Sequence, residues 1–305
     1  MKTKKNWGGK WTEEKLDAFE KYVKAYLTIM NVYRDTYGWK LIYFDGFAGS
    51  GERNQDEEVL EAQSATDLFG QEVAVGDFNV YQGAAERVVK IEGGDFRSFD
   101  YFYFVEKNEE NCKCLSDKLS PYHTIGKRHY LNKDANEAVK MLASTLHNYS
   151  NCKALAFLDP FGMQIDWSSI EMLKDLSVDL WILVPTGVII NRLLERKIDQ
   201  QKGLAHAEKL EVFFGLPKEQ IKKLFYTEKK VMTLFSEEEM VITKAENSIR
   251  KIAQIYVERL KDVFPYVTDE PMVLYNNHNV PIYHFVFASK NKVAMKIAQE
   301  IISKQ

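Results

Sequence analysis

The stretch Leu41-Ile-Tyr-Phe-Asp-Gly-Phe-Ala-Gly-Ser-Gly51 decides the fold of this chain. Its first four residues form an apolar run of strand length, and Asp45 follows. Three glycines come next, at Gly46, Gly49 and Gly51. A buried strand that runs into a Gly-rich turn is typical of parallel α/β sheets, where backbone N–H groups are presented to a ligand. A ligand-binding loop and an ordinary turn with a structural Asp45 both fit this stretch taken alone.

Further apolar runs predict additional strands of the same sheet. They cover 99–106, 129–131, 154–158 and 178–184. Helical patterns alternate with them, over 108–119, 134–146 and 167–176, and an amphipathic helix over 11–36 precedes the first strand. Strands that alternate with helices and are continuously apolar predict a parallel sheet covered on both faces.

The C-terminal part predicts a different ending to the sheet. A long amphipathic helix over 244–264 is followed by two short apolar runs, 272–275 and 282–288, around the turn-rich cluster 276–279. These runs predict an antiparallel pair, and 293–303 predicts a terminal helix. The fold class expected is therefore α/β, Rossmann-like, with a mainly parallel sheet that ends in an antiparallel hairpin. We expect one domain over 1–305, with an insertion at 52–98 and a helical insertion at 188–243.

Composition indicates an ordinary soluble globular protein. Apolar residues make up 45% of the chain, charged residues 28%, and the net charge is −3. This balance gives no sign of a nucleic-acid coat or a membrane surface. We interpret the Lys-rich stretch 218–230 as a solvated helix face rather than a nucleic-acid patch. The basic start at 1–10 lacks an apolar segment behind it, and no run is long enough to span a membrane, so we expect a cytoplasmic protein without membrane association.

The three cysteines, Cys112, Cys114 and Cys152, have no paired spacing. An odd number argues against a disulfide framework and fits a reducing compartment. On a helix, positions i and i+2 lie on different faces, and no Cys/His pair stands nearby at zinc spacing. The sequence therefore predicts no metal site.

Acids stand at four successive junctions of the predicted sheet: Asp45, Glu106, Asp134 and Asp159. Each one alone fits a helix N-cap or a solvated loop residue. Right-handed crossovers bring the ends of parallel strands to one edge, so we expect the four together there. A Gly-rich first loop suits an amino-acid tail, the second acid a ribose diol and the third an adenine amine. This set describes S-adenosylmethionine (SAM) better than NAD, and the first loop departs from G-x-G-x-x-G.

A parallel sheet that ends in an antiparallel hairpin resembles class I SAM-dependent methyltransferases. The resemblance implies that SAM is the cofactor. It assigns the loop from Asp45 to Gly51 to the methionine end, Glu106 to the ribose and Asp134 to the adenine side. The implied cofactor-binding set is Asp45, Gly46, Phe47, Gly49, Gly51, Glu106, Lys107, Asp134, Ala135 and Asp159.

The run Asp159-Pro160-Phe161-Gly162 resembles the fourth motif of amino-methylating enzymes. It is closer still to the Asp-Pro-Phe-Gly motif of a family of tRNA guanine N2-methyltransferases. The resemblance implies methyl transfer to an exocyclic amine of a nucleobase in DNA or RNA. Asp159 Oδ or the Pro160 carbonyl would accept the amine hydrogens, and Phe161 would stack on the base. Phe161 replaces the second Pro of the common motif, so packing of Phe161 under the sheet edge is the alternative.

Across nearly the whole chain, the sequence resembles the three-Cys-motif partner protein family, TcmP. The resemblance rests on the motifs 15–26, 44–51, 104–106, 134–138, 157–167, 183–188 and 191–194. It implies a bacterial or phage-related origin and a radical-SAM-like partner protein that carries the three-Cys motif. It implies no particular substrate.

Two functions follow as the main alternatives, and a nucleotide-binding subunit without transfer chemistry is a third. In the first, the protein is a SAM-dependent methyltransferase, a transferase that modifies an amino nitrogen of a nucleic-acid base. In the second, it is a catalytically weak or inactive interaction partner that keeps the methyltransferase fold. The acidic segment 52–98 is a candidate substrate lid or partner contact.

Overall fold

The computed structural model describes residues 10–50, 81–91, 97–160, 162–187, 201–232, 238–244, 248–276 and 279–305. The helices of these ranges are α1 (Lys10–Tyr37), α4 (Tyr81–Val89), α5 (Glu109–Leu119), α6 (Ala135–Asn148), α7 (Trp167–Glu171), α9 (Gln201–Phe214), α10 (Lys218–Phe225), α11 (Ser248–Lys261) and α12 (Lys292–Ser303). The strands are β1 (Lys40–Asp45), β2 (Tyr101–Glu106), β3 (Lys127–Asn132), β4 (Cys152–Leu158), β5 (Val178–Val184), β6 (Tyr226–Met232), β7 (Glu238–Lys244), β8 (Tyr266–Val267), β9 (Met272–Tyr275) and β10 (Pro281–Ser289).

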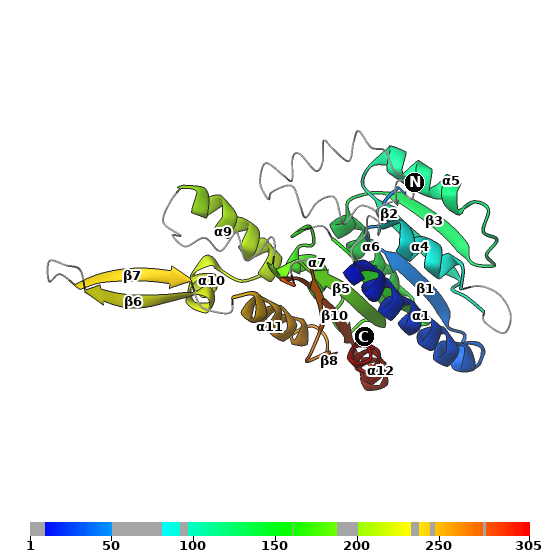
Figure 1. The fold of residues 1–305 in the computed structure, drawn as a ribbon. Coiled ribbons are helices and arrows are strands. Elements are labelled where there is room, and N and C mark those ends of the chain that lie inside the picture. The colour runs from blue at the N-terminus through cyan, green and yellow to red at the C-terminus, as the bar shows by residue number, and fades with distance from the viewer. Residues whose placement is uncertain are drawn as a thin grey trace, which may run out of the picture.

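Within these ranges, eight strands form one sheet in the order β3-β2-β1-β4-β5-β10-β8, and β9 pairs with the same edge of β10 as β8. The pairs among the first five strands of this order are parallel, whereas β10 is antiparallel to β5. The predicted α/β, Rossmann-like class with a terminal antiparallel hairpin is confirmed (Figure 1).

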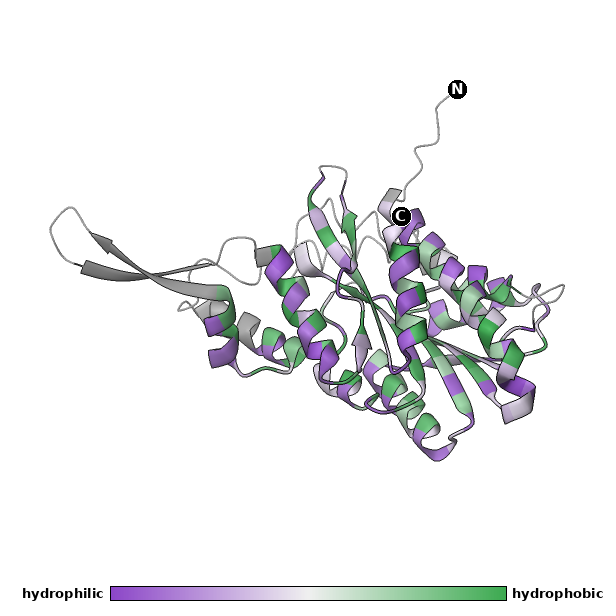
Figure 2. Ribbon diagram, turned by 90° about the horizontal axis from the view of Figure 1, so that it is seen from below, coloured by the Kyte–Doolittle hydropathy of each residue, from purple (hydrophilic) through white to green (hydrophobic). Residues whose placement is uncertain are grey.

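Helices cover both faces of the sheet because side chains alternate along buried strands. Leu41 and Tyr43 pack into one apolar cluster with α1, α4, α5 and α12. Ile42 and Phe44 pack into a second cluster with α6, α7, α9, α10 and α11. Figure 2 shows the result, since the strands are mainly hydrophobic and the helices carry hydrophilic residues between their hydrophobic ones. None of the helices in the described ranges is long and apolar enough to cross a membrane.

The insertion predicted to be helical over 188–243 is only partly so. Its described part contains α9 and α10, but β6 and β7 then form an antiparallel hairpin, which extends away from the main sheet in Figure 1. The Lys-rich stretch is therefore helical only to Phe225, and β7 begins at Glu238. Thr, Val and Ile favour strands because of their branched Cβ, and cross-strand pairing such as Thr227 with Thr243 completes the hairpin.

Two further predictions need correction or restriction. The helix predicted over 167–176 ends at Glu171, because the chain continues in turns with i→i−3 bonds such as Leu173 N–H to the Ile170 carbonyl. Most of the insertion predicted over 52–98 lies outside the described residues. Its described part contains α4.

Gly126 offers a test of the packing between β2 and β3. A Cβ at this position would lie 2.1 Å from the Phe99 carbonyl oxygen and 2.8 Å from Phe102 Cε2. We expect Gly126→Ala to lower the free energy of unfolding by roughly 3 kcal/mol, because backbone must move. Gly38→Ala is the control, since Gly38 has φ +62° but no atom within 4 Å of a Cβ, and should cost about 1 kcal/mol. Urea denaturation measures both, and an equal cost would contradict the described packing.

Candidate functional site

The register of the parallel strands brings three acids to one edge of the sheet. Asp45 stands opposite Phe104 of β2 and Phe157 of β4. Glu106 lies two residues beyond Phe104, and Asp159 lies two residues beyond Phe157. Residues two apart on a strand point to the same side, so the side chains of these three positions follow one face of the sheet to its carboxyl edge.

Asp45 is buried, with 1% of its surface exposed. The Tyr43 hydroxyl donates to its Oδ2 at 3.2 Å and the Phe47 N–H to its Oδ1 at 3.1 Å. Burial raises the pKa of Asp45 to about 7, and the charge of Asp159 adds to the rise, although the bonds from Phe47 and Tyr43 and the charge of Lys15 oppose it. The carboxyl group is therefore balanced between its neutral and charged forms near pH 7 and would favour a cationic neighbour.

The Gly-rich loop is held by both neighbouring strands. The Gly46 N–H donates to the Phe157 carbonyl of β4, and the Ala48 N–H donates to the Val105 carbonyl of β2, each at 2.9 Å. A Cβ on Gly46 would lie 2.4 Å from Leu158 Cδ2, so a larger residue here would require the Leu158 side chain to move. Gly49 has φ +66°, a conformation that favours glycine. Gly51 lies outside the described residues.

Glu106, the predicted ribose acid, and Asp134, the predicted adenine-side acid, lie on neighbouring turns. Glu106 Oε1 accepts the Asn108 N–H at 2.8 Å, where β2 passes into α5. Asp134 caps α6, because its Oδ1 accepts the Asn136 N–H at 2.9 Å, and Lys107 Nζ lies 3.4 Å from its Oδ2. Burial alone would raise the pKa of Asp134, but the bonds from Asn136 and Lys107 outweigh it and lower that pKa. Ala135 is the buried first residue of α6.

Asp159 is bound by a residue that the sequence did not suggest. Lys15 Nζ lies 2.6 Å from Asp159 Oδ2, and both side chains are only 2% exposed. Lys15 also lies over the ring of Trp11, 5.5 Å from its centroid. The available signal was its place on α1, where Lys15 falls on the apolar stripe formed by Trp11, Phe19 and Tyr22 at helical spacing.

The rest of the predicted catalytic run is described only in part. Pro160 and Gly162 are buried, directly after the end of β4. Phe161 lies outside the described residues, so base stacking by Phe161 stays a prediction. The structure thus brings Asp45, Glu106, Asp159 and the capping Asp134 to one edge, as the sequence predicted, and adds Lys15 to them.

No protein-family model matches the chain. No curated protein matches it with significant similarity either. The resemblance to the TcmP family and the assignments that follow from it therefore stay predictions.

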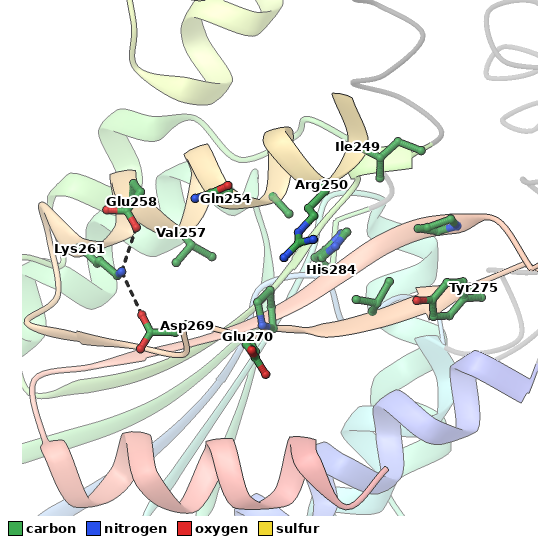
Figure 3. Close-up of a pocket in the computed structure, with 14 residues that line it drawn as sticks. Ile249, Arg250, Gln254, Val257, Glu258, Lys261, Asp269, Glu270, Tyr275 and His284 are labelled. Atoms are coloured by element: carbon green, nitrogen blue, oxygen red, sulfur yellow. Dashed lines mark hydrogen bonds and ion pairs between the residues drawn. The ribbon is translucent and has the colours of Figure 1, made fainter. Parts of the chain in front are cut away.

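A groove of about 1080 Å³ lies elsewhere, between α11 and the β9–β10 hairpin (Figure 3). Its wall contains His284, which is 6% exposed and whose Nδ1 lies 2.7 Å from the Oγ1 of the buried Thr186. Burial lowers the pKa of His284 to about 4, so the ring is neutral at pH 7. Sequence reasoning missed this pair, because a lone His in an apolar strand and a Thr after another strand show no pattern.

We expect Lys15 and Asp159 to be strongly coupled in their effect on the free energy of unfolding. Lys15→Met leaves a buried carboxylate without its ammonium, so the free energy of unfolding should fall by roughly 3–5 kcal/mol. Asp159→Asn should cost a similar amount, and the double variant should cost clearly less than the sum. Urea denaturation of the four proteins gives the coupling energy.

The exposed pair of Lys24 with Glu20, at 2.7 Å, is the matched control. Its coupling should not exceed about 0.5 kcal/mol, as for other surface pairs on one helix. Equal coupling for the two pairs would contradict the burial of Lys15 and Asp159.

We expect the stability difference between Asp45→Asn and the wild-type protein to depend on pH. Because its pKa is raised to about 7 in the folded protein, the folded state holds a proton that the unfolded state loses near pH 4. The contribution of Asp45 to stability is therefore present below about pH 4 and is lost as the pH rises to about 7. Asp45→Asn removes this loss. The free energy of unfolding of the variant, relative to that of the wild type, should therefore rise between about pH 4 and pH 7 by up to ~1.4 kcal/mol per pH unit. A difference that does not change with pH would contradict the assignment.

Proposed function

We propose that the protein is a class I SAM-dependent methyltransferase. The observation that carries the proposal is the sheet order β3-β2-β1-β4-β5-β10-β8, with an antiparallel strand beside β5 and acids at the carboxyl ends of β1, β2 and β4. This arrangement resembles that of class I methyltransferases, which bind their cofactor at that edge of the sheet.

The charges at the edge fit SAM better than a dinucleotide. Four acids, Asp45, Glu106, Asp134 and Asp159, stand at this edge, where Lys15 binds Asp159 and Lys107 binds Asp134. An edge lined by carboxyl groups favours a ligand with a sulfonium, an ammonium and hydroxyl groups, and it disfavours a pyrophosphate. The loop around Gly49 would hold the methionine end, Glu106 the ribose and Asp134 the adenine side. SAM supplies an electrophilic methyl group, and the protein's contribution is then to bind and orient.

We assign the methyl acceptor to an amino nitrogen of a nucleic-acid base, on the resemblance of the run 159–162 to amino-methylating enzymes. The buried ion pair of Asp159 supports different roles within this run. Since Lys15 engages Asp159 Oδ2, Asp159 is a positioning residue that holds the turn after β4. The Pro160 carbonyl is then the acceptor for the amine hydrogens, and Phe161 the stacking ring.

A second function is an interaction partner that keeps this fold without efficient transfer. The specific observation in its favour is the buried Lys15–Asp159 pair, because it engages one oxygen of a carboxylate that amino-methylating chemistry would otherwise use. In both functions we propose membership of the TcmP family, a three-Cys-motif partner of radical-SAM-like type, a phage-related origin and a cytoplasmic location.

Titration calorimetry with SAM tests the proposal. We expect binding by the wild-type protein and a loss of roughly tenfold or more in affinity for Glu106→Gln, because a carboxylate that accepts two hydroxyl bonds is replaced. Glu110→Gln is the matched control, since Glu110 is an exposed acid in the first turn of α5. Absence of SAM binding by the wild-type protein, or equal losses for both variants, would contradict the proposed cofactor site.

A further inference from the structure

The groove between α11 and the β9–β10 hairpin has two ends of different charge. At one end Lys261 Nζ binds Glu258 at 2.9 Å and Asp269 at 3.0 Å, so these charges largely satisfy one another. At the other end Arg250 points from α11 into the groove (Figure 3) and forms no ion pair with the described residues. Without an ion pair in the described ranges, this guanidinium is the group of the groove that would gain most from an anion.

His284 supplies a second donor on the opposite wall. Its Nδ1 is held by Thr186, which leaves Nε2 to face the groove from β10. When the Thr186 hydroxyl donates to Nδ1, the neutral ring carries its proton on Nε2 and can donate it to a ligand. A buried imidazole fixed by a buried hydroxyl is pre-organised, and Figure 3 shows it at the same end of the groove as Arg250.

This end of the groove opens at the edge of the sheet where the acids of β1, β2 and β4 lie. His284 stands opposite Val184, the last residue of β5, because β10 is antiparallel to it. Tyr275, 44% exposed, pairs with Pro281 at the same end and lines the groove with an aromatic ring. A ligand held by Arg250 would thus continue toward Pro160 across the end of β5.

We propose that this end of the groove binds a phosphodiester of a single-stranded nucleic acid, the methyl acceptor, with Arg250 and His284 Nε2 on the phosphate oxygens and Tyr275 stacked on a neighbouring base. The inference rests on the proposed function for the chemistry at the strand ends. A phosphodiester is a monoanion, which suits one guanidinium in a groove that also contains Glu258, Asp269 and Glu270. An unpaired base is required because only such a base exposes a face to an aromatic side chain.

The test is fluorescence anisotropy with short labelled single-stranded DNA and RNA oligonucleotides over a series of salt concentrations. Arg250→Gln should weaken binding roughly tenfold, since a charge-assisted contact is lost. It should also reduce the slope of log K against log salt by about 0.7, the value for one phosphate on a single strand. Tyr275→Leu should weaken binding about fivefold or more with no change in this slope, because stacking is lost and charge is not.

Lys251→Gln is the matched control, because Lys251 lies one residue away on α11 but lines a different groove, against α10. It removes the same charge and should leave both affinity and slope unchanged. Equal effects of Arg250→Gln and Lys251→Gln, or no effect of either, would overturn the proposal. So would binding of an acidic peptide that depends on Arg250 when neither oligonucleotide binds.

Calorimetry with SAM separates this proposal from the proposed function. Arg250→Gln should bind SAM as the wild-type protein does, because Arg250 lies outside the cofactor set. If the wild-type protein fails to bind SAM yet loses oligonucleotide affinity on Arg250→Gln, the cofactor assignment fails and the groove assignment stands. If the wild-type protein binds SAM but Arg250→Gln does not change oligonucleotide affinity, the groove assignment fails and the cofactor assignment stands.

Discussion

The pairing of β1 between β2 and β4 is the constraint on which the rest of the structure depends. Its register sets Asp45 level with Phe104 and Phe157, and this alone brings Glu106 and Asp159 to the same edge. A slip of one residue would turn the apolar side chains of β1 to the wrong cluster and direct Asp45 to the opposite face. The loop after β1 reinforces the register, because Gly46 and Ala48 donate to carbonyls on both neighbouring strands.

Bringing acids together at a buried edge is electrostatically unfavourable, and the fold offsets this in two ways. Lys15 neutralises Asp159 from α1, whereas Asp45 receives neutral donors and has a pKa raised to about 7 by burial. Helix α1 is therefore part of the site, although it precedes the first strand in the chain. A cationic cofactor would suit this acidic edge, and Arg250 in the α11 groove would suit an anionic acceptor.

The fold was largely predictable, because buried parallel strands are continuous apolar runs such as 154–158 and each is bounded by helical periodicity. The acids at the strand ends were predictable for the same reason. The role of Lys15 was not predictable. A lysine in an apolar helical stripe is normally interpreted as a surface residue unless its partner, here 144 positions away, is known. The β6–β7 hairpin was missed because its charged residues obscure the β-branched ones, and the Thr186–His284 pair because it exists only through the pairing of β10 with β5.

The central claim is that the acidic edge of β1 and β2 holds SAM. Ultraviolet crosslinking of methyl-labelled SAM to the wild-type protein, followed by peptide mapping, tests it most directly. The account predicts label in the peptides that contain the loop after Asp45 or the turn after Glu106, and competition by unlabelled SAM. Label confined to the α11 groove, or spread over the chain without competition, would contradict it.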